Sequence, residues 1–221
     1  MPRLLFEKMG NAVWISHLDL MRVFQRAFRR AGIAIYHSQG YSPRAHVSMA
    51  LPLPVGTESQ CELLDFAFAE GAQLPLESLP ARLNAVLPAG IRVLSAWEGG
   101  KKLKELTYLD ASLTLQYDHG LPAGAGEKIL AFFQSGQPVI VPKRTKTGQT
   151  QLDIQPMIQA VSILGCWETT LQLQCRVCAQ NPSLNPMLLP EALRLHRPEL
   201  APDFAKARRL EILDSSGAQF R

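Results

Sequence analysis

The chain has 221 residues, enough for one large domain or for two of about 100 residues each, and either can bury a hydrophobic core. Hydrophobic residues make up 47% of the chain and charged residues 19%, which excludes an intrinsically disordered protein. The net charge of +4 is compatible with a nucleic-acid partner but does not require one, so the arrangement of the charges has to decide.

The N-terminal sequence reaches charged residues too early to form the apolar centre of a signal peptide, since Arg3 is soon followed by Glu7 and Lys8. No window approaches the roughly 20 apolar residues that a membrane span requires. The chain contains four cysteines, and without a secretion signal we expect them to stay reduced. The sequence therefore predicts a cytoplasmic protein that does not contact a membrane.

The first half of the chain shows hydrophobic periodicities in the order β-α-β-β-α-β. A strand at residues 3–8 precedes a helix that is capped by Ser16 and stopped by Gly32. The later elements are predicted as strands at residues 47–51 and 62–68, a helix at 76–87 and a strand at 91–97.

The second half repeats this order after a linker at residues 99–102. The predicted elements are a strand at 109–117, a helix at 126–134, strands at 139–141 and 167–177, a helix at 190–196 and a strand at 209–213. The two predicted second helices also share a motif, which reads Leu79-Pro80-x-x-Leu83 in one and Leu189-Pro190-x-x-Leu193 in the other. The pattern predicts an α+β fold of two tandem ferredoxin-like (β-α-β-β-α-β) domains, residues 1–98 and 104–214. A single fused α+β sheet is the competing arrangement.

The Cys175-x-x-Cys178 pair suggests a zinc or redox site, but its setting argues against one. Side chains alternate between apolar and polar from Trp167 to Val177, which is typical of a half-buried strand with Trp167 and Cys175 on its buried face. A spacing of three along a strand places the two thiols on opposite faces, and no second cysteine pair completes a four-ligand site. We therefore expect no metal and no cofactor. A C-x3-C-x2-C run is also absent, so the chain cannot itself hold a radical-SAM iron–sulfur cluster.

The helix after Ser16 carries a row of arginines on the face opposite its apolar residues. These arginines are Arg22, Arg26, Arg29 and Arg30. Asp19 is the only acid in this helix, so we expect little pairing within it, and a row of free guanidinium groups suits contacts to several phosphates. The alternatives are a solvated helix face or ion pairs with Glu62 and Asp65.

The segment after this helix combines a glycine loop with further polar groups. Gly40, Ser42 and Arg44 are candidate phosphate-binding residues, although a turn with positive φ also explains Gly40. His17, Tyr41 and His46 are candidate catalytic residues, because imidazole titrates near neutrality and RNA can be cleaved through its own 2′-hydroxyl without a metal. A structural role for these histidines is the alternative.

A second basic segment lies in the C-terminal half and contains Lys143, Arg144 and Lys146. It is a candidate second phosphate contact, or charge that only keeps the protein in solution. Aromatic residues of the RNA-recognition-motif type are not evident on a central strand, so base stacking of that kind is not predicted.

Several of these segments together resemble one bacterial family. The matching residues are Phe6, Trp14-Ile15-Ser16-His17-Leu18-Asp19-Leu20-Met21-Arg22, Arg26-Ala27, Arg29-Arg30-Ala31-Gly32, Ser38-Gln39-Gly40-Tyr41-Ser42-Pro43, Ala50-Leu51-Pro52-Leu53, Gly56 and, in the second half, Asp153-Ile154-Gln155-Pro156. They resemble the radical-SAM-linked protein family, a bacterial domain of unknown function that is fused to, or encoded beside, cobalamin-binding radical-SAM proteins. This chain has Arg44-Ala45 where the family pattern has His-Pro, which weakens any catalytic role there.

The resemblance implies a radical-SAM protein as partner and points towards RNA as ligand, but it implies no activity of the chain itself. The function expected from residues and resemblance together is a non-catalytic RNA-binding or substrate-presenting module for a radical-SAM modification enzyme. Two alternatives remain open. One is a metal-independent nuclease or RNA-modifying enzyme that uses His17 with Tyr41 or His46, and the other is a protein-binding adaptor whose arginines face acidic residues of its partner.

Overall fold

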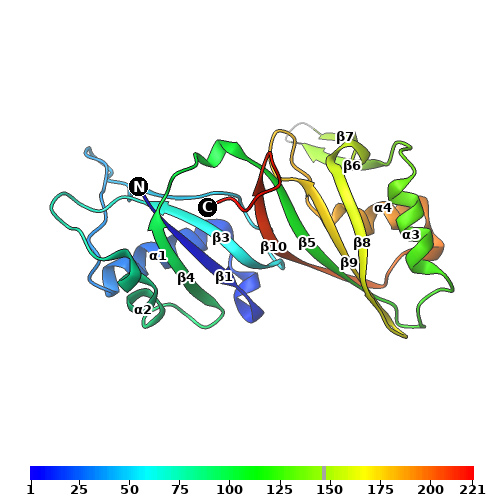
Figure 1. The fold of residues 1–221 in the computed structure, drawn as a ribbon, viewed down its shortest axis with the longest axis horizontal. Coiled ribbons are helices and arrows are strands. Elements are labelled where there is room, and N and C mark those ends of the chain that lie inside the picture. Colours follow the sequence, from blue (N-terminus) through cyan, green and yellow to red (C-terminus); the bar gives the residue numbers. More distant parts are fainter. Residues whose placement is uncertain (146–147) are drawn as a thin grey trace. The chain divides into compact units, whose positions relative to one another are not determined.

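The computed structural model of the protein describes residues 1–145 and 148–221 and has a mixed α+β fold (Figure 1). Its internal contacts divide the chain into an N-terminal unit, Met1–Glu105 with Arg221, and a C-terminal unit, Leu106–Phe220. Within the described ranges, every helix is too short or too polar to span a bilayer.

The N-terminal unit consists of a small antiparallel sheet with two α-helices. Its elements are β1 (Pro2–Lys8), η1 (Gly10–Trp14), α1 (His17–Arg30), β2 (Val47–Met49), β3 (Glu58–Phe66), η2 (Leu76–Ser78), α2 (Leu79–Asn84), β4 (Ile91–Glu98) and η3 (Leu103–Glu105). Strand β1 lies between β4 and β3, β2 pairs with β3, and each of these pairings is antiparallel.

Helix α1 begins and ends where the sequence predicts. The Oγ of Ser16 accepts a hydrogen bond from the Asp19 backbone N–H at 3.2 Å, which satisfies one of the free donors of the first turn. At the other end Gly32 adopts a φ of +66°, and its N–H donates to the Arg29 carbonyl. A left-handed glycine at this position ends a helix without the steric cost that a side chain would add.

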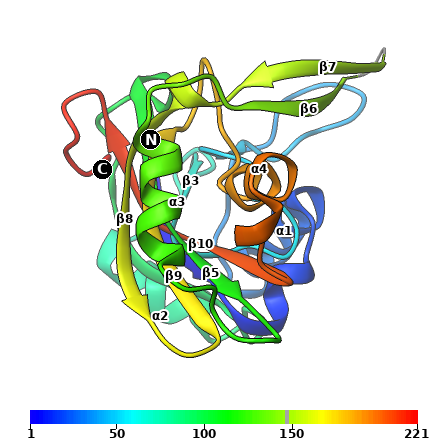
Figure 2. The same ribbon diagram turned by 90° about the vertical axis from the view of Figure 1, so that its right-hand side faces the viewer.

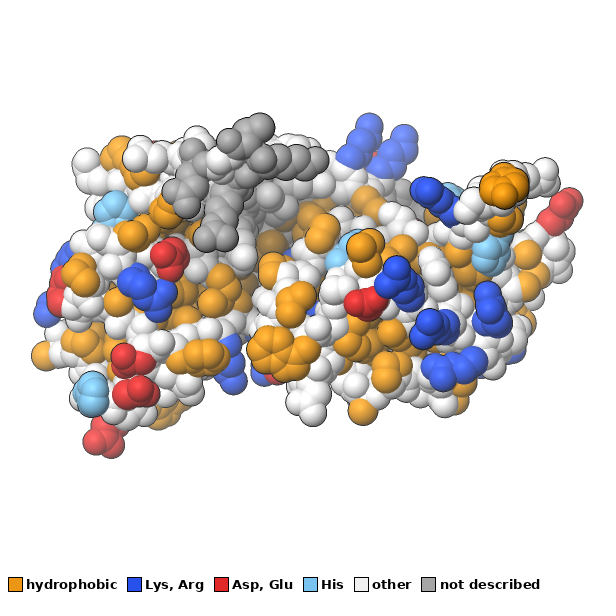
Figure 3. Space-filling view, turned by 180° about the vertical axis from the view of Figure 1, so that it is seen from behind, with side chains coloured by type: hydrophobic (Ala, Val, Ile, Leu, Met, Phe, Trp, Pro, Cys, Tyr) orange, Lys and Arg blue, Asp and Glu red, His pale blue; other side chains and the backbone are white. Residues whose placement is uncertain are grey.

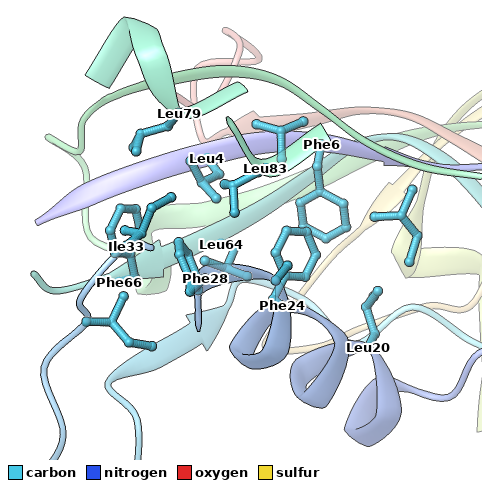
Figure 4. Close-up of a cluster of buried hydrophobic side chains, with 14 of the residues drawn as sticks. Leu4, Phe6, Leu20, Phe24, Phe28, Ile33, Leu64, Phe66, Leu79 and Leu83 are labelled. Carbon is cyan, nitrogen blue, oxygen red and sulfur yellow. The ribbon is translucent and has the colours of Figure 1, made fainter. Parts of the chain in front are cut away.

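The core of the N-terminal unit forms where α1 lies on the sheet (Figure 4). The buried side chains of α1 are Leu20, Phe24, Ala27 and Phe28, and the sheet contributes Leu4, Phe6, Leu64 and Phe66. The rings of Phe6 and Phe24 meet edge to face with their centroids 4.6 Å apart. Because these buried side chains of α1 pack on the sheet, the opposite side of the helix faces outward.

In the C-terminal unit the main strands pair antiparallel in the order β10-β5-β9-β8. Its elements are β5 (Leu106–Gln116), α3 (Ala125–Gln134), β6 (Ile140–Thr145), β7 (Gly148–Asp153), η4 (Gln155–Met157), β8 (Ile158–Cys166), β9 (Thr170–Cys178), α4 (Leu188–His196), η5 (Pro198–Leu200) and β10 (Phe204–Asp214). Strands β6 and β7 pair only with each other among the described strands and form a hairpin apart from the main sheet of this unit (Figure 2).

The strand predicted at residues 139–141 is present as the start of β6, but it belongs to the β6–β7 hairpin and not to the main sheet. The place beside β9 is taken by β8 instead. The register of β8 shifts between Ile158 and Ala160 and again between Ile163 and Gly165. These irregularities break the period of two, which is the signal that strand prediction needs.

Two other predicted elements are corrected at their ends. The strand predicted from Trp167 starts at Thr170, because the Trp167 N–H donates to the Thr170 carbonyl and closes the turn after β8, which leaves the indole exposed. The helix predicted at 76–87 is a 3-10 turn followed by the shorter α2. Pro80 has no N–H and is tolerated only in the first turn, so the α-helix cannot start much before it.

The repeated Leu-Pro-x-x-Leu motif has the same place in both units. It opens α2 in the N-terminal unit and lies in the first turns of α4 in the C-terminal unit. The leucines Leu79, Leu83, Leu189 and Leu193 are all buried. Each motif therefore buries two leucines near the start of a helix.

Two leucines of α1 provide a test of this packing. Leu20→Ala should lower the free energy of unfolding by about 2–5 kcal/mol, because the side chain is 2% exposed and its removal leaves a cavity. Leu18→Ala, the same change at a side chain that is 68% exposed, should alter it by no more than about 0.5 kcal/mol. Urea denaturation followed by circular dichroism measures both free energies. An equal decrease in the two variants would contradict the packing of α1 through Leu20 against the sheet.

Candidate nucleic-acid interface

The outward face of α1 carries four exposed arginines, Arg22, Arg26, Arg29 and Arg30. Lys and Arg side chains gather on the α1 side of the N-terminal unit, with few acidic side chains among them (Figure 3). The row predicted from helical spacing is thus present on one surface.

Two of the four arginines are held by neighbours within their unit. Arg22 forms an exposed ion pair with Asp19 at 2.8 Å, so the expectation of little pairing within the helix is wrong for this residue. The three-residue separation brings the two side chains together on the helix surface. The Arg30 guanidinium donates to the Val86 carbonyl at 2.6 Å.

The other two arginines keep their guanidinium groups available. Within residues 1–145 and 148–221, the side chains of Arg26 and Arg29 form no hydrogen bond and no close ion pair. Asp65, one of the acids that sequence reasoning offered as a partner, is instead bound by Arg3 through contacts of 2.6 and 2.9 Å. An arginine without a protein partner can give both edges of its guanidinium to an anion.

The segment after α1 folds back on itself as a tongue, which we define as residues 35–46. The Ser38 N–H donates to the Arg44 carbonyl at 2.8 Å, and the Arg44 N–H donates to the Ser38 hydroxyl at 3.0 Å. Gly40 adopts a φ of +134° at the turn, a conformation that L side chains rarely adopt. Tyr41 follows it and is fully exposed.

Helix α1 and the tongue enclose a groove of about 910 Å³, called here the α1 groove. His17, Arg22 and Arg29 line it from α1, and His37 and Arg44 line it from the tongue. The remaining lining residues are Leu18, Met21, Gln25, Ile33, Ala34, Ile35, Pro43 and Ala45. No carboxylate is among the described lining residues, so the groove combines apolar walls with positive charge.

His37 is a groove residue that the sequence analysis missed. Its Nδ1–H donates to the Ile35 carbonyl at 3.0 Å, since a carbonyl can only accept. The bond leaves Nε2 free for another partner. The available signal was the alternation of Ile33, Ile35 and His37, which puts all three on one side of an extended segment.

The other predicted residues of the tongue lie outside the lining of the groove. The ring of His46 meets Tyr36 edge to face at 6.1 Å between centroids. Gly40, Tyr41 and Ser42 are exposed in the tongue. The structure therefore brings His17 together with His37 in the α1 groove, but places neither Tyr41 nor His46 there.

The predicted second basic segment belongs to the C-terminal unit. Lys143 and Arg144 lie in β6, where Lys143 is exposed, and Lys146 lies outside the described residues.

A buried lysine orders the backbone that leads into α1. The Nζ of Lys8 donates to the Ile15 carbonyl at 2.7 Å and to the Val13 carbonyl at 3.2 Å. Desolvation by burial lowers the pKa of Lys8, and the nearby charge of Glu62 partly opposes this shift. The two hydrogen bonds tie the segment before Ser16 to the end of β1, so that the start of α1 has a defined position.

The cysteine pair behaves as its strand pattern predicts. Cys175 is fully buried, and burial raises the pKa of its thiol to about 12. Cys178 is partly exposed and belongs to the opposite row of β9. Among the described residues, no three side chains of the metal-binding types lie close enough to hold an ion.

By its architecture the chain is a mixed α+β protein with a basic groove on one helix. It belongs to the family described as "Uncharacterized protein conserved in bacteria (DUF2344)", whose model matches residues 2–186. No curated protein matches the chain.

Solved structures give remote likenesses. The chain is similar to one in an H/ACA ribonucleoprotein bound to a substrate RNA containing 2′-deoxyuridine, with a TM-score of 0.47, 8% identity, and coverage of 94% of this chain and 46% of that one. A Cbf5-Nop10-Gar1 complex gives a TM-score of 0.47, 9% identity, and coverage of 96% and 48%. An unknown protein from Galdieria sulphuraria gives 0.23, 12% identity, and coverage of 94% and 96%. The chain spans less than half of the first two, and likenesses this remote carry no argument about function.

Thiol labelling tests the environment of the cysteines. In the native protein at pH 8, iodoacetamide should modify the exposed Cys166 and spare Cys175, because burial shields the Cys175 thiol and raises its pKa, and the thiolate is the reactive form. Unfolding in urea should make Cys175 react like Cys166. Peptide mass spectrometry reads each site, and rapid native labelling of Cys175 would contradict its burial.

Proposed function

We propose that this chain is an RNA-binding module that presents RNA to a radical-SAM modification enzyme, with the α1 groove as its RNA-binding surface. The observation that carries the proposal is the convergence of Arg22, Arg29 and Arg44 on one groove without an acidic lining residue among those described. Such a surface attracts phosphate groups, and no described carboxylate in its lining repels them.

The hydrogen bonding of Arg29 and Arg44 is compatible with contacts from both side chains to phosphate. Arg29 lines the groove and has no described hydrogen-bond partner, so binding an anion costs it no existing contact. Arg44 is fixed at its backbone by Ser38, while its side chain lines the groove. Guanidinium groups on positioned backbone suit two-pronged contacts to phosphate oxygens.

For the fold we propose two tandem ferredoxin-like domains, residues 1–98 and 104–214. In the C-terminal unit, apart from the β6–β7 hairpin, the main elements follow the chain order β-α-β-β-α-β, and the strand order β10-β5-β9-β8 supports the proposal. In the N-terminal unit, the order β4-β1-β3 with β2 on β3 supports the same arrangement. The β6–β7 hairpin is then an insertion between the first helix and the second strand.

The proposed partner follows from the family resemblance. The chain lacks the cysteine run of a radical-SAM cluster, so the radical chemistry belongs to a separate protein or domain in the bacterial cytoplasm. On this proposal the chain contributes affinity for RNA. A protein-binding adaptor, the competing function, would use the same arginines against acidic side chains.

Arginine substitutions test the proposal directly. Arg29→Gln should weaken RNA binding by about tenfold, as expected for the loss of one charge-assisted contact, and should do so for all sequences alike. The slope of log affinity against log salt should become shallower by about 0.7–0.9. Fluorescence anisotropy with labelled oligoribonucleotides measures both quantities. Arg26→Gln should act in the same way because its guanidinium is also unengaged.

The matched control is Arg92→Gln. Arg92 is exposed on β4, in the row opposite the buried Ile91 and Val93, so it lies on the sheet face away from α1. The change removes the same charge from the same unit, and it should leave the affinity nearly unchanged. An equal loss in Arg92→Gln would indicate a general effect of net charge, and absence of RNA binding by the native protein would contradict the proposed function.

One observation favours a second candidate function, metal-independent RNA cleavage. His17 and His37 line the same groove, and the Nδ1 bond of His37 leaves Nε2 able to exchange a proton. In such a reaction one imidazole takes the proton of the 2′-hydroxyl as its oxygen attacks phosphorus. The other gives a proton to the departing 5′-oxygen.

Turnover separates the two functions. If the chain is a binding module, purified protein should bind a labelled RNA and leave it intact, and His17→Ala should likewise produce no cleavage. A cleavage activity lost in both His17→Ala and His37→Ala, but retained in His46→Ala, would establish the enzymatic alternative instead. Denaturing gel electrophoresis of the RNA gives the result.

A further inference from the structure

We infer that the α1 groove takes an unpaired nucleotide, so that the protein recognises single-stranded and not double-stranded RNA. This inference rests on the proposed function and names the class of RNA that the same site accepts. It depends on three features: the composition of the groove, a second hollow beside it, and an exposed tyrosine on the tongue.

The lining of the α1 groove has two chemistries. Leu18, Met21, Ile35 and Pro43 give it apolar walls, while the guanidinium groups described above supply charge. Its volume of about 910 Å³ lies within the roughly 300–1,000 Å³ typical of pockets that enclose small organic ligands. A nucleobase is flat and largely apolar on its faces, and its phosphate is an anion. An unstacked nucleotide therefore matches both parts of the lining.

A second hollow of about 370 Å³ adjoins the same helix. It is lined by Val23, Arg26, Arg29, Arg30 and Pro88, so Arg29 belongs to both hollows. A strand that crosses α1 can thus place one phosphate at Arg29 and a neighbouring nucleotide on each side. Separate hollows on both sides of one cation suit a flexible strand whose bases can turn away from one another.

Tyr41 adds a surface for stacking. It is fully exposed on the tongue, whose residues Pro43 and Arg44 line the groove. An aromatic ring in this position contributes nothing to the core, yet it offers both faces to a base. Stacking on exposed aromatic side chains is a general means of binding single strands without reading their sequence.

A duplex does not fit these features. Its bases are paired and stacked inside a stiff helix, so neither hollow could receive one. A-form RNA presents phosphates and 2′-hydroxyl groups to a protein and keeps its major groove too narrow for side chains. The apolar walls of the α1 groove and the ring of Tyr41 would then contact only charged backbone.

The experiment compares a single-stranded oligoribonucleotide with a blunt hairpin that has the same number of phosphates, at one salt concentration. The two strands of the hairpin are joined by an ethylene-glycol linker, so that it contains no unpaired nucleotide. Ala34→Phe narrows the groove without changing any charge, because Ala34 is exposed and lines the groove. Tyr41→Ala removes the stacking surface. Ala81→Phe, the same change at an exposed position of α2 that lines neither hollow, is the control for the first substitution. Phe204→Ala, at an exposed ring of the C-terminal unit, is the control for the second.

We expect the native protein to bind the single strand at least about tenfold more tightly than the hairpin. Ala34→Phe and Tyr41→Ala should each weaken single-strand binding by about tenfold, the effect of one lost base contact, and leave hairpin binding unchanged. The control variants should bind like the native protein.

Equal or tighter binding of the hairpin would overturn this inference while leaving RNA binding intact. Undiminished single-strand affinity in both Ala34→Phe and Tyr41→Ala would overturn it as well. Binding of neither RNA would remove the proposed function and the inference together. Circular dichroism spectra and melting temperatures of the variants, matched to those of the native protein, ensure that a lost affinity reports on the groove.

Discussion

The seating of α1 on the sheet of the N-terminal unit is the constraint on which the candidate site depends. Edge-to-face packing of Phe6 and Phe24 and burial of Leu20 and Phe28 fix which way the helix is turned. A helix has only one orientation in which this stripe is removed from water. The arginine row is outward because the phenylalanines are inward, so the core determines where the charge appears.

The segments at the two ends of α1 are also held in place, and they position the remaining residues of the groove. At the N-terminus, the buried Lys8 ties down the carbonyls of Val13 and Ile15, and the Ser16 cap then starts the helix at His17. At the C-terminus, Gly32 turns the chain back towards the same helix, so that the tongue lies beside the arginine face. One short stretch of chain therefore supplies both walls of the groove.

Two aspartates form ion pairs with arginines outside the α1 row, and they do not neutralise the arginine face of α1. Asp65 is bound by Arg3, and in the C-terminal unit Asp110 is bound by Arg176 through a pair of contacts at 2.8 and 2.9 Å. Only Asp19 meets an arginine of the α1 row by an ion pair among the described residues, and that pair is exposed and therefore weak. An entering phosphate can compete with such a pair, whereas a buried pair would resist it.

Local signals in the sequence determined where α1 begins and ends and which of its faces carries the arginines. The cap at Ser16, the stop at Gly32 and the helical spacing of the arginines are short-range features, and the structure confirms each of them. The burial of Cys175 was predictable for the same reason, since alternation along one strand reports which side faces the core.

Only the tertiary structure decided what depends on contacts between distant segments. Strand β8 escaped prediction because its register breaks remove the alternation, and its place is set by β9 instead. The engagement of Arg30 by Val86 and of Asp65 by Arg3 joins residues far apart in the chain. His17 and His37 line one groove, and Tyr41 and His46 do not, because of how the tongue folds back beside α1. No local sequence pattern determines how such a segment folds back.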